Sequence, residues 1–393
     1  MTRPRVALII TAWFRGSHAD VLATDLVQGY EWNGEFGPAR VEVVSAYLEQ
    51  SGTVGPEGQR PDVGLEILAD GGVPLYPTPA EALGCGAPGV NVDGIVIIGE
   101  HGIYEENEYG QQVYPRRRFF DACVSAMIAA DRFVPIFNDK HLAWNWTDAK
   151  AMYDTARRLG VPLLAGSSIP VAWRKPQGTE WPMGAPMTEI VCATYGPFER
   201  YGFHGLEGAQ AFAERRAGGE TGVVEVRGYE GDRVAEGLAT IDPDLLRRAV
   251  AETPLRDGEG DVDEAIAKIK YVITAVHRDG LKSATVISEG LQGFGIAATG
   301  PEHEVDCELH LQGNPHSHFR FLGRAAEQMI IDGVPPYPGA ERTLLTGGIL
   351  DHAMRNAKGA VEPGTPHLDV SYSVPGHIAD TGAHLPPYEH ADN

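Results

Sequence analysis

Four polar side chains, three of which can take part in catalysis, directly follow an apolar run in the middle of the chain. Residues 133–137 (FVPIF) form the run, and Asn138, Asp139, Lys140 and His141 come after it. In an open parallel α/β sheet, ligands bind outside the carboxyl ends of the strands, so residues in this position face a cleft. A lysine there can donate hydrogen bonds to a substrate oxygen or, with a lowered pKa, transfer a proton. A solvated polar loop is the alternative interpretation.

A second strand end supplies further candidates. Residues 95–98 (IVII) are followed by Glu100 and His101, and we expect both strand ends to face one cleft, with His204 joining from the second half of the chain. Imidazoles with carboxylates can bind Zn²⁺, Mn²⁺ or Fe²⁺, or form a metal-free hydrogen-bonded network. If a divalent metal is bound, the expected ligands are Glu100, His101, Asp139, His141 and His204.

Three consecutive arginines, 116–118, begin a predicted helix. Cations at this end of a helix oppose its dipole, so they need compensation. They bind an anionic group or pair with Glu105, Glu106 and Glu108, and we favour the ion pairs. The polar segment 104–114 is a long insertion at a strand end, which is typical of a lid over a cleft.

The first 164 residues alternate strand and helix patterns. Strands are predicted at 5–11, 40–47, 73–76, 92–98, 133–138 and 162–166, and helices at 19–30, 62–71, 116–130 and 147–159. Nearly continuous apolar strands between helices are typical of a doubly wound parallel sheet that is covered on both faces. The sequence therefore predicts a Rossmann-like nucleotide-binding domain over residues 1–164.

The pattern changes after residue 164. Strands are predicted at 187–195, 222–229, 284–288, 293–298 and 303–311, and helices at 203–216, 243–252, 261–271, 318–331 and 340–358. Strands with few crossovers predict an α+β domain over 165–358, with a large, mainly antiparallel open sheet. Residues 359–393 have little periodicity and predict an extended C-terminal arm.

This organisation resembles that of the Gfo/Idh/MocA family over nearly the whole chain, from Arg5 to about Lys358. Residues 138–143 (NDKHLA) lie where that family has Glu-Lys-Pro-Leu-Ala, and residues 202–207 (GFHGLE) resemble its Gly-x-His-x-x-Asp helix start. Residues 318–355 resemble its C-terminal helix, Gly-x-Pro-Pro turn and final helix. The resemblance implies that Lys140 is the catalytic lysine and His204 the catalytic histidine.

The resemblance implies an oxidoreductase of carbohydrate metabolism, which transfers a hydride between NAD or NADP and a sugar, polyol or related hydroxy compound. Lys140 would hydrogen-bond the reacting oxygen and His204 would accept the hydroxyl proton, while Asp139 and His141 orient Lys140 or tune its pKa. The expected substrate-binding residues are Glu100, His101, Arg200, Trp173 and Arg174.

The sequence of the turn after the first predicted strand differs from that of the family. Where the family has Gly-x-Gly-x-x-Gly, residues 11–18 read TAWFRGSH, and only Gly16 remains. Trp13 and Phe14 would block the approach of a pyrophosphate unless the turn is remodelled. The expected cofactor-binding residues are Thr11, Arg15, Gly16, Ser17, His18 and Glu49. The alternative is a hydrolase, lyase or isomerase that has lost the dinucleotide and uses the His/carboxylate cluster; a non-catalytic sensor is a third hypothesis.

The amino-acid composition limits the kinds of molecule that the protein is expected to bind. The chain has 54 acidic and 32 basic residues, a net charge of -22, which repels phosphate backbones and anionic lipids, so neither nucleic acid nor a membrane is an expected partner. The four cysteines form no C-x-x-C pair, which favours a reduced, cytoplasmic protein. We expect a small-molecule substrate and a homodimer or homotetramer.

Overall fold

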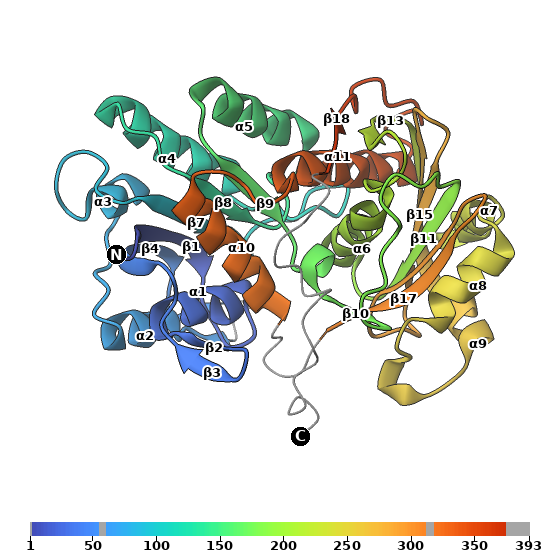
Figure 1. Cartoon of the computed structure of the whole chain (residues 1–393), viewed down its shortest axis with the longest axis horizontal. Helices are drawn as coiled ribbons and strands as arrows, with labels where there is room; N and C mark the ends of the chain where they lie inside the picture. The colour runs from blue at the N-terminus through green and yellow to red at the C-terminus, as the bar shows by residue number, and fades with distance from the viewer. Residues whose placement is uncertain (1, 55–59, 312–317, 375–393) are drawn as a thin grey trace.

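The computed structural model describes residues 2–54, 60–311 and 318–374 of the 393-residue chain. Two main sheets lie side by side with helices around each (Figure 1). The smaller paired segments are β2 (Tyr30–Trp32), β3 (Glu35–Gly37), β5 (Thr53–Val54), β6 (Arg60–Pro61), β12 (Glu220–Thr221) and β18 (Ser371–Tyr372). Among the described residues, no helix combines the length and apolar character needed to cross a membrane.

The first sheet is parallel throughout, as the sequence predicts. Its order is β4-β1-β7-β8-β9, with β1 (Arg5–Ala12), β4 (Glu42–Gln50), β7 (Gly94–Ile98), β8 (Ile136–Asp139) and β9 (Leu163–Gly166). The helices between these strands are α1 (His18–Gln28), α2 (Gly64–Asp70), α3 (Pro79–Gly84), α4 (Arg116–Ala130) and α5 (Trp146–Leu159). Ala7 and Ile9 of β1 pack in one core and Leu8 and Ile10 in another, so the strand is buried on both faces.

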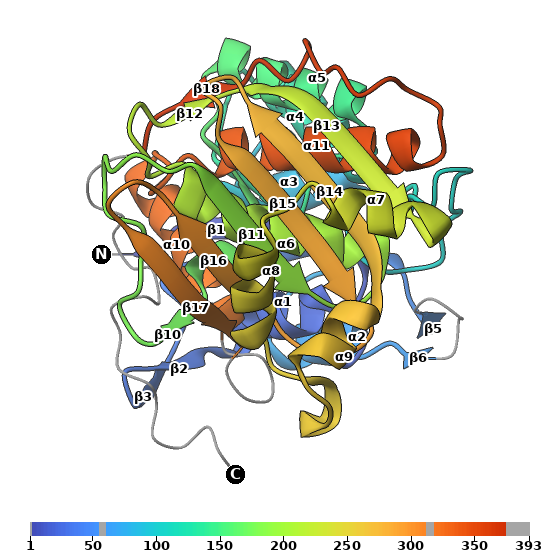
Figure 2. The same ribbon diagram turned by 90° about the vertical axis from the view of Figure 1, so that its right-hand side faces the viewer.

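The second sheet is mainly antiparallel and open, also as predicted. Its order is β10-β17-β16-β11-β15-β14-β13, with β10 (Trp173–Lys175), β11 (Glu189–Thr194), β13 (Val223–Glu230), β14 (Ile269–His277), β15 (Lys282–Ser288), β16 (Gly295–Thr299) and β17 (Glu304–His310). Within it, β11 and β15 pair in parallel. Helices α6 (Phe198–Ala213) and α11 (Gly339–Ala357) cover one face, and α7 (Val234–Leu238), α8 (Pro243–Ala251) and α9 (Val262–Ala267) lie on the other (Figure 2).

Helix α10 (His318–Asp332) returns to the first sheet. Its apolar side chains, including Phe321 and Met329, pack in the same core as Leu8 of β1. The approach is so close that a Cβ atom on Gly94 of β7 would lie 2.8 Å from Cγ1 of Ile330. A helix from within the span 165–358 therefore completes the core of the N-terminal layer, while the division near residue 164 remains a prediction.

Some sequence-based boundaries were wrong. The helix predicted at 261–271 ends at Ala267, and Ile269 begins β14, which the sequence analysis missed. The strand predicted at 73–76 is reduced to one bridge between Leu75 and Ala46. Both segments are rich in apolar residues, so the local pattern alone does not decide between helix, strand and loop, and the packing of the rest of the fold sets the local structure.

The described part of the predicted C-terminal arm runs along the second sheet. The N–H of Val223 donates to the carbonyl of Leu368 over 3.0 Å, and that of Val226 donates to the carbonyl of Pro363 over 2.9 Å. Strand β18 then pairs with β12. Residues 360–374 thus pack on β13 and β12, and the rest of the predicted arm, 375–393, lies outside the described residues.

Candidate active site

Lys140 lies at the carboxyl end of β8, where its backbone N–H donates to the carbonyl of Gly166 over 3.0 Å. Its φ of 66° is in the left-handed region, an unusual conformation for a lysine and one found at functional sites. The side chain is buried; its Nζ atom lies 3.5 Å from Oε1 of Glu100 and donates to the carbonyl of Arg200 over 3.2 Å. Burial lowers the pKa of Lys140 although Glu100 opposes the change.

Glu100 lies between two cations. Arg116, wholly buried in the first turn of α4, forms an ion pair with Glu100. Burial alone would raise the pKa of Glu100, but the charges of Lys140 and Arg116 hold it well below its usual value. The expected pairs of the arginines with Glu105, Glu106 and Glu108 were wrong. Arg117 pairs with Asp121 and Arg118 with Glu49.

Three histidines from different elements gather beside this ion-pair cluster. His18 begins α1, His101 follows β7, and His204 lies on α6; the ring of His18 is 5.4 Å from that of His101 and 6.2 Å from that of His204, centre to centre. Burial lowers the pKa of His101 to about 3. Burial and the charge of Lys140 hold the pKa of His204 well below its usual value. Both rings are therefore neutral at pH 7.

The histidines line a cavity of about 160 Å³. One water needs roughly 10–15 Å³ of cavity volume, so this cavity has room for on the order of ten waters or for a small polyol or sugar. Its walls are Gly16, His18, Val21, His101, Ser168, Ile169, Tyr195, Tyr201, His204, Phe294, Leu311, His318 and Phe319. Lys140 is not among them. Its buried Nζ atom faces Glu100 and the carbonyl of Arg200, so the hydrogen bond expected from it to the reacting oxygen is not placed here, although its charge helps to lower the pKa of His204.

Asp139 and His141 were expected to orient Lys140 or tune its pKa. The charge of Asp139 does raise the pKa of Lys140 against the larger effect of burial, but neither side chain is hydrogen-bonded to the amine, which faces Glu100 and the carbonyl of Arg200. Oδ2 of Asp139 lies 2.7 Å from Nδ1 of His18, so the carboxylate orients a histidine. The ring of His141 stacks on Phe203 at 4.6 Å, and its Nε2 atom lies 3.6 Å from a carboxylate oxygen of Glu199. Burial lowers the pKa of His141, which fits a neutral ring packed in the interior.

The expected substrate-binding residues divide into two groups. Glu100, His101 and the backbone of Arg200 belong to the site described above. Arg174 instead donates to the carbonyl of Pro170 over 2.9 Å and lies 3.4 Å from Glu180, while Trp173 is buried in a core. Neither lines the cavity.

The sequence analysis missed Tyr201, Tyr195 and Phe294, which supply the aromatic wall of the cavity. The ring of Tyr201 lies 5.9 Å from that of His204, centre to centre. Residues three apart share a helix face, so Tyr201 could have been inferred from His204. Tyr195 and Phe294 come from distant strand ends and carry no such signal.

The first turn uses its own hydrogen-bond donors. The N–H groups of Phe14 and Gly16 donate to Oγ of Ser17 (3.2 Å) and Oδ2 of Asp20 (2.9 Å), and the N–H of Ser17 donates to the carbonyl of Phe14 (2.9 Å). A pyrophosphate bound in the usual way would need these donors. The carboxylate of Asp20 also places a negative charge at the start of α1.

Side chains fill the space beyond this turn. Trp13 is wholly buried, and its carbonyl accepts a hydrogen bond of 2.9 Å from the N–H of Val63. Phe14 packs against Val54, and the guanidinium of Arg60 lies over its ring at 5.4 Å. Val54, Arg60 and Val63, which follow β4, therefore lie against the turn that a dinucleotide phosphate would approach.

The remaining candidates for cofactor binding are engaged elsewhere. Oγ1 of Thr11 donates to the carbonyl of Glu100 over 2.7 Å, and Arg15 is exposed and paired with Asp20. Glu49 lies within β4, where it accepts hydrogen bonds of 2.6 Å from Tyr104 and from Arg118. Gly16 and His18 alone of the six expected residues line the cavity. The residues present do not fit a dinucleotide held by the backbone of the first turn.

The expected metal ligands do not form a metal site. Across residues 2–54, 60–311 and 318–374, no three His, Cys, Asp or Glu side chains are placed to hold one ion. Glu100 is engaged by two cations and Asp139 by His18, so the carboxylates of the expected set have other partners.

No protein-family profile matches the sequence, and no curated protein matches it significantly. Solved structures do match. GenD2 from gentamicin A biosynthesis, solved with NAD, is 14% identical with a TM-score of 0.58, covering 93% of this chain and 97% of its own. Levoglucosan dehydrogenase, solved with NADH and L-sorbose, is 12% identical with a TM-score of 0.57, covering 93% of this chain and 100% of its own.

A myo-inositol dehydrogenase from Corynebacterium glutamicum is 11% identical with a TM-score of 0.52, covering 91% of this chain and 97% of its own. At such low identity, likeness of this kind bears on the fold rather than on the substrate or cofactor. The chain has the two-layer fold of the Gfo/Idh/MocA-type dehydrogenases, as its resemblance to them implies.

Proposed function

We propose that this chain is an oxidoreductase that acts on the C–O group of a small sugar, polyol or related hydroxy compound. The observation that carries the proposal is a neutral His204 in the wall of a small cavity, with the charge of Lys140 acting on it. The dehydrogenases that share the fold support the class of reaction.

His204 is the proposed general base. A histidine that stays neutral at pH 7 has a ring nitrogen free to accept the proton of a substrate hydroxyl. The positive charge of Lys140 favours this neutral form.

His18 is a second candidate for proton transfer. Its Nδ1 atom faces the buried carboxylate of Asp139, which fixes the tautomer with the proton on Nδ1 and leaves Nε2 as an acceptor. His18 lines the same cavity as His204. Two imidazoles around one small cavity suit a substrate with neighbouring hydroxyl groups.

A non-redox isomerase or lyase is a second candidate, and the first turn favours it. The backbone donors of Phe14, Gly16 and Ser17 are used internally, and Asp20 places a negative charge there. The proton-transfer roles of His204 and His18 would serve such a reaction unchanged, because moving a proton next to a carbonyl needs no hydride.

Dinucleotide titration and turnover measurements distinguish the two candidates. Melting temperature is followed with NAD or NADP at about 1 mM, because a ligand specific to the folded state raises it. Polyols and sugars are then assayed for reduction of either cofactor, and for conversion without cofactor. Cofactor-dependent turnover supports the oxidoreductase; turnover without cofactor, and no melting shift, supports the second candidate. Activity retained in His204→Gln, with His310→Gln as matched control, would contradict both.

We also propose that the protein is a cytoplasmic homo-oligomer with a small-molecule substrate. An open sheet commonly buries its free face against a second copy. Here α8 packs on β11 and β16 and so covers part of that face (Figure 2). We therefore expect the contact to use the uncovered part of the sheet, which size-exclusion chromatography with light scattering would detect.

A further inference from the structure

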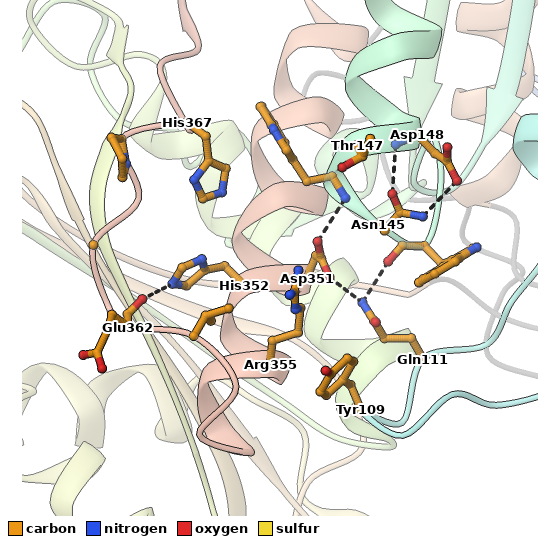
Figure 3. Close-up of a pocket in the computed structure, with 15 residues that line it drawn as sticks. Tyr109, Gln111, Asn145, Thr147, Asp148, Asp351, His352, Arg355, Glu362 and His367 are labelled. Atoms are coloured by element: carbon orange, nitrogen blue, oxygen red, sulfur yellow. Dashed lines mark hydrogen bonds between the residues drawn. The ribbon is translucent and has the colours of Figure 1, made fainter.

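A second cavity, of about 850 Å³, lies apart from the candidate active site and shares no lining residue with it. Its walls come from the loop around Tyr109 and Gln111, residues 144–148 at the start of α5, the last turns of α11, and residues 361–367 (Figure 3). The volume is in the range of small-molecule sites. Two of its walls belong to segments expected to be a lid and an arm, which otherwise have no role.

Arg355 of α11 has no partner of its own within this cavity. Of the described residues, none offers it a carboxylate oxygen within 4 Å, and its Nε atom is buried without a hydrogen bond. Its guanidinium lies over the ring of Tyr109, 5.5 Å from the centre. Stacking on one face leaves the N–H groups at the edge free for a planar oxyanion. The side chain is half-buried and its shielded Nε atom has no hydrogen-bond partner, so an oxyanion on the edge of the guanidinium would supply the missing acceptor.

The acids nearest to Arg355 are already used. Oδ1 of Asp351 accepts a hydrogen bond of 3.0 Å from Nε2 of Gln111, and Oδ2 accepts one of 3.0 Å from the N–H of Trp146. Asp148 lies 3.8 Å from Arg117, and Glu362 points away from the other labelled side chains (Figure 3). Asp351 therefore ties three wall segments together, with both of its oxygens accepting from donors other than Arg355.

Two histidines supply groups for hydroxyls. Nε2 of His352 lies 2.8 Å from the carbonyl of Glu362, so Nε2 carries the proton and Nδ1 is left as an acceptor. Burial lowers the pKa of both His352 and His367, which keeps the rings neutral at pH 7. The ring of His367 packs 5.4 Å from that of Trp146, centre to centre. The cavity thus combines one arginine, two neutral histidines and aromatic surfaces with three carboxylates, those of Asp148, Asp351 and Glu362, of which the first two have partners other than Arg355.

We propose that this cavity binds a small hydroxylated carboxylate or phosphate, with its oxyanion on Arg355 and its hydroxyl groups on the histidine side. The proposal does not depend on the reaction catalysed at the other cavity. It also gives residues 361–367 a function, because they complete the wall that carries the hydroxyl-binding groups.

Calorimetric titration of the full chain tests the proposal with D-gluconate and glycerol 3-phosphate as probes and D-glucose as the neutral comparison. We expect one or both anions to bind, and D-glucose to bind at least tenfold more weakly. Arg355→Met should weaken anion binding by about tenfold or more, since a charge-assisted contact is lost. Arg247→Met, which removes an exposed arginine paired with Asp263, is the matched control and should bind as the wild type does.

The two anions distinguish a carboxylate ligand from a phosphate ligand. The planar guanidinium can form two parallel hydrogen bonds with a planar carboxylate, so we expect D-gluconate to bind more tightly than glycerol 3-phosphate. If Arg355→Met does not fold, Arg355→Lys keeps the charge but not the fork and should weaken gluconate binding severalfold. The proposal is overturned if the wild type binds neither anion at about 10 mM, or if the variants at Arg355 bind them as tightly as the wild type.

Discussion

Nδ1 of His18 lies 2.7 Å from Oδ2 of Asp139, although the two residues are 121 positions apart in the chain. The contact joins the first residue of α1 to the last residue of β8. Asp139 is wholly buried, so its carboxylate accepts this hydrogen bond away from water. The hydrogen bond holds the start of α1 to the carboxyl end of β8, next to Lys140.

Asp139→Asn should change the tautomer of His18. In the wild type the carboxylate accepts from Nδ1, so Nδ1 carries the proton; an amide can donate as well as accept and no longer fixes that choice. ¹⁵N NMR of the imidazole should show one well-defined tautomer in the wild type and a mixture, or the opposite tautomer, in the variant. Asp121→Asn, at a surface pair, is the control. An unchanged His18 spectrum in Asp139→Asn would show that the hydrogen bond does not set the tautomer.

Glu100→Gln should destabilise the protein strongly. The substitution leaves Arg116 and Lys140 as buried cations without an acid between them, and breaking a buried pair costs about 3–5 kcal/mol. The free energy of unfolding, measured in urea, should fall by about this amount. Glu225→Gln, which removes an exposed pair with Arg227, should change it by less than about 1 kcal/mol. Equal effects of the two substitutions would contradict the buried-cluster interpretation.

Stability should fall as the pH is lowered below about 6.5. The folded pKa values of His101, His141 and His204 lie below the unfolded value, to about 3 for His101, so the unfolded chain takes up protons first. Their contribution is complete above the unfolded pKa and is lost as pH falls towards the folded values. Each neutral histidine adds a slope of up to about 1.4 kcal/mol per pH unit. Urea denaturation between pH 7.5 and 5 measures this slope, and His101→Gln should reduce it.

Lys140→Met should raise the pKa of His204. The charge of Lys140 is a main cause, after burial, of the lowered pKa of His204, and Glu100 would then act on the ring less opposed. An NMR titration of the His204 ring should show the pKa moving towards its ordinary value, while Lys150→Met at an exposed pair leaves it unchanged. If the pKa of His204 does not change in Lys140→Met, the charge of Lys140 does not control the protonation of His204.

Gly228→Ala should loosen the contact between β13 and α11. A Cβ atom at this position would lie 1.9 Å from the carbonyl oxygen of Ala353, so the helix backbone must move. Overpacking of this kind costs about 1–3 kcal/mol of unfolding free energy. Gly37→Ala meets no atom within 4 Å and is the matched control. Equal melting temperatures for the two variants would show that α11 can move away from β13 without loss of stability.

The sequence predicts the first sheet well because its strands are buried on both faces. Val6 to Ile10 and Ile95 to Ile98 are nearly continuous apolar runs, and this pattern is specific to central parallel strands. Strand β14 was harder, because its start follows a helix directly at Lys268 and its two faces differ in burial. Its place in the sheet depends on β13 and β15, which lie on either side of it.

The candidate site could be predicted only in part. Glu100 and Lys140 could be predicted from the sequence, because each follows an apolar run that forms a strand. Their partners could not be found, since the contact of Glu100 with Arg116 depends on how α4 packs against β7, and that of Asp139 with His18 on how β8 lies relative to α1. The closed first turn was foreseen from Trp13 and Phe14, but not the use of Asp20 to occupy its donors.

The position of α10 bears on how the protein is made. Residues 1–164 leave the ribosome first, yet the surface of β7 around Gly94 is covered by Ile330, which is synthesised near the end of the chain. During translation, the N-terminal sheet therefore exposes an apolar strip on β7 until α10 has been synthesised. Exposed apolar surface of this kind binds chaperones and promotes aggregation. A recombinant fragment that stops at residue 164 would carry the same strip permanently.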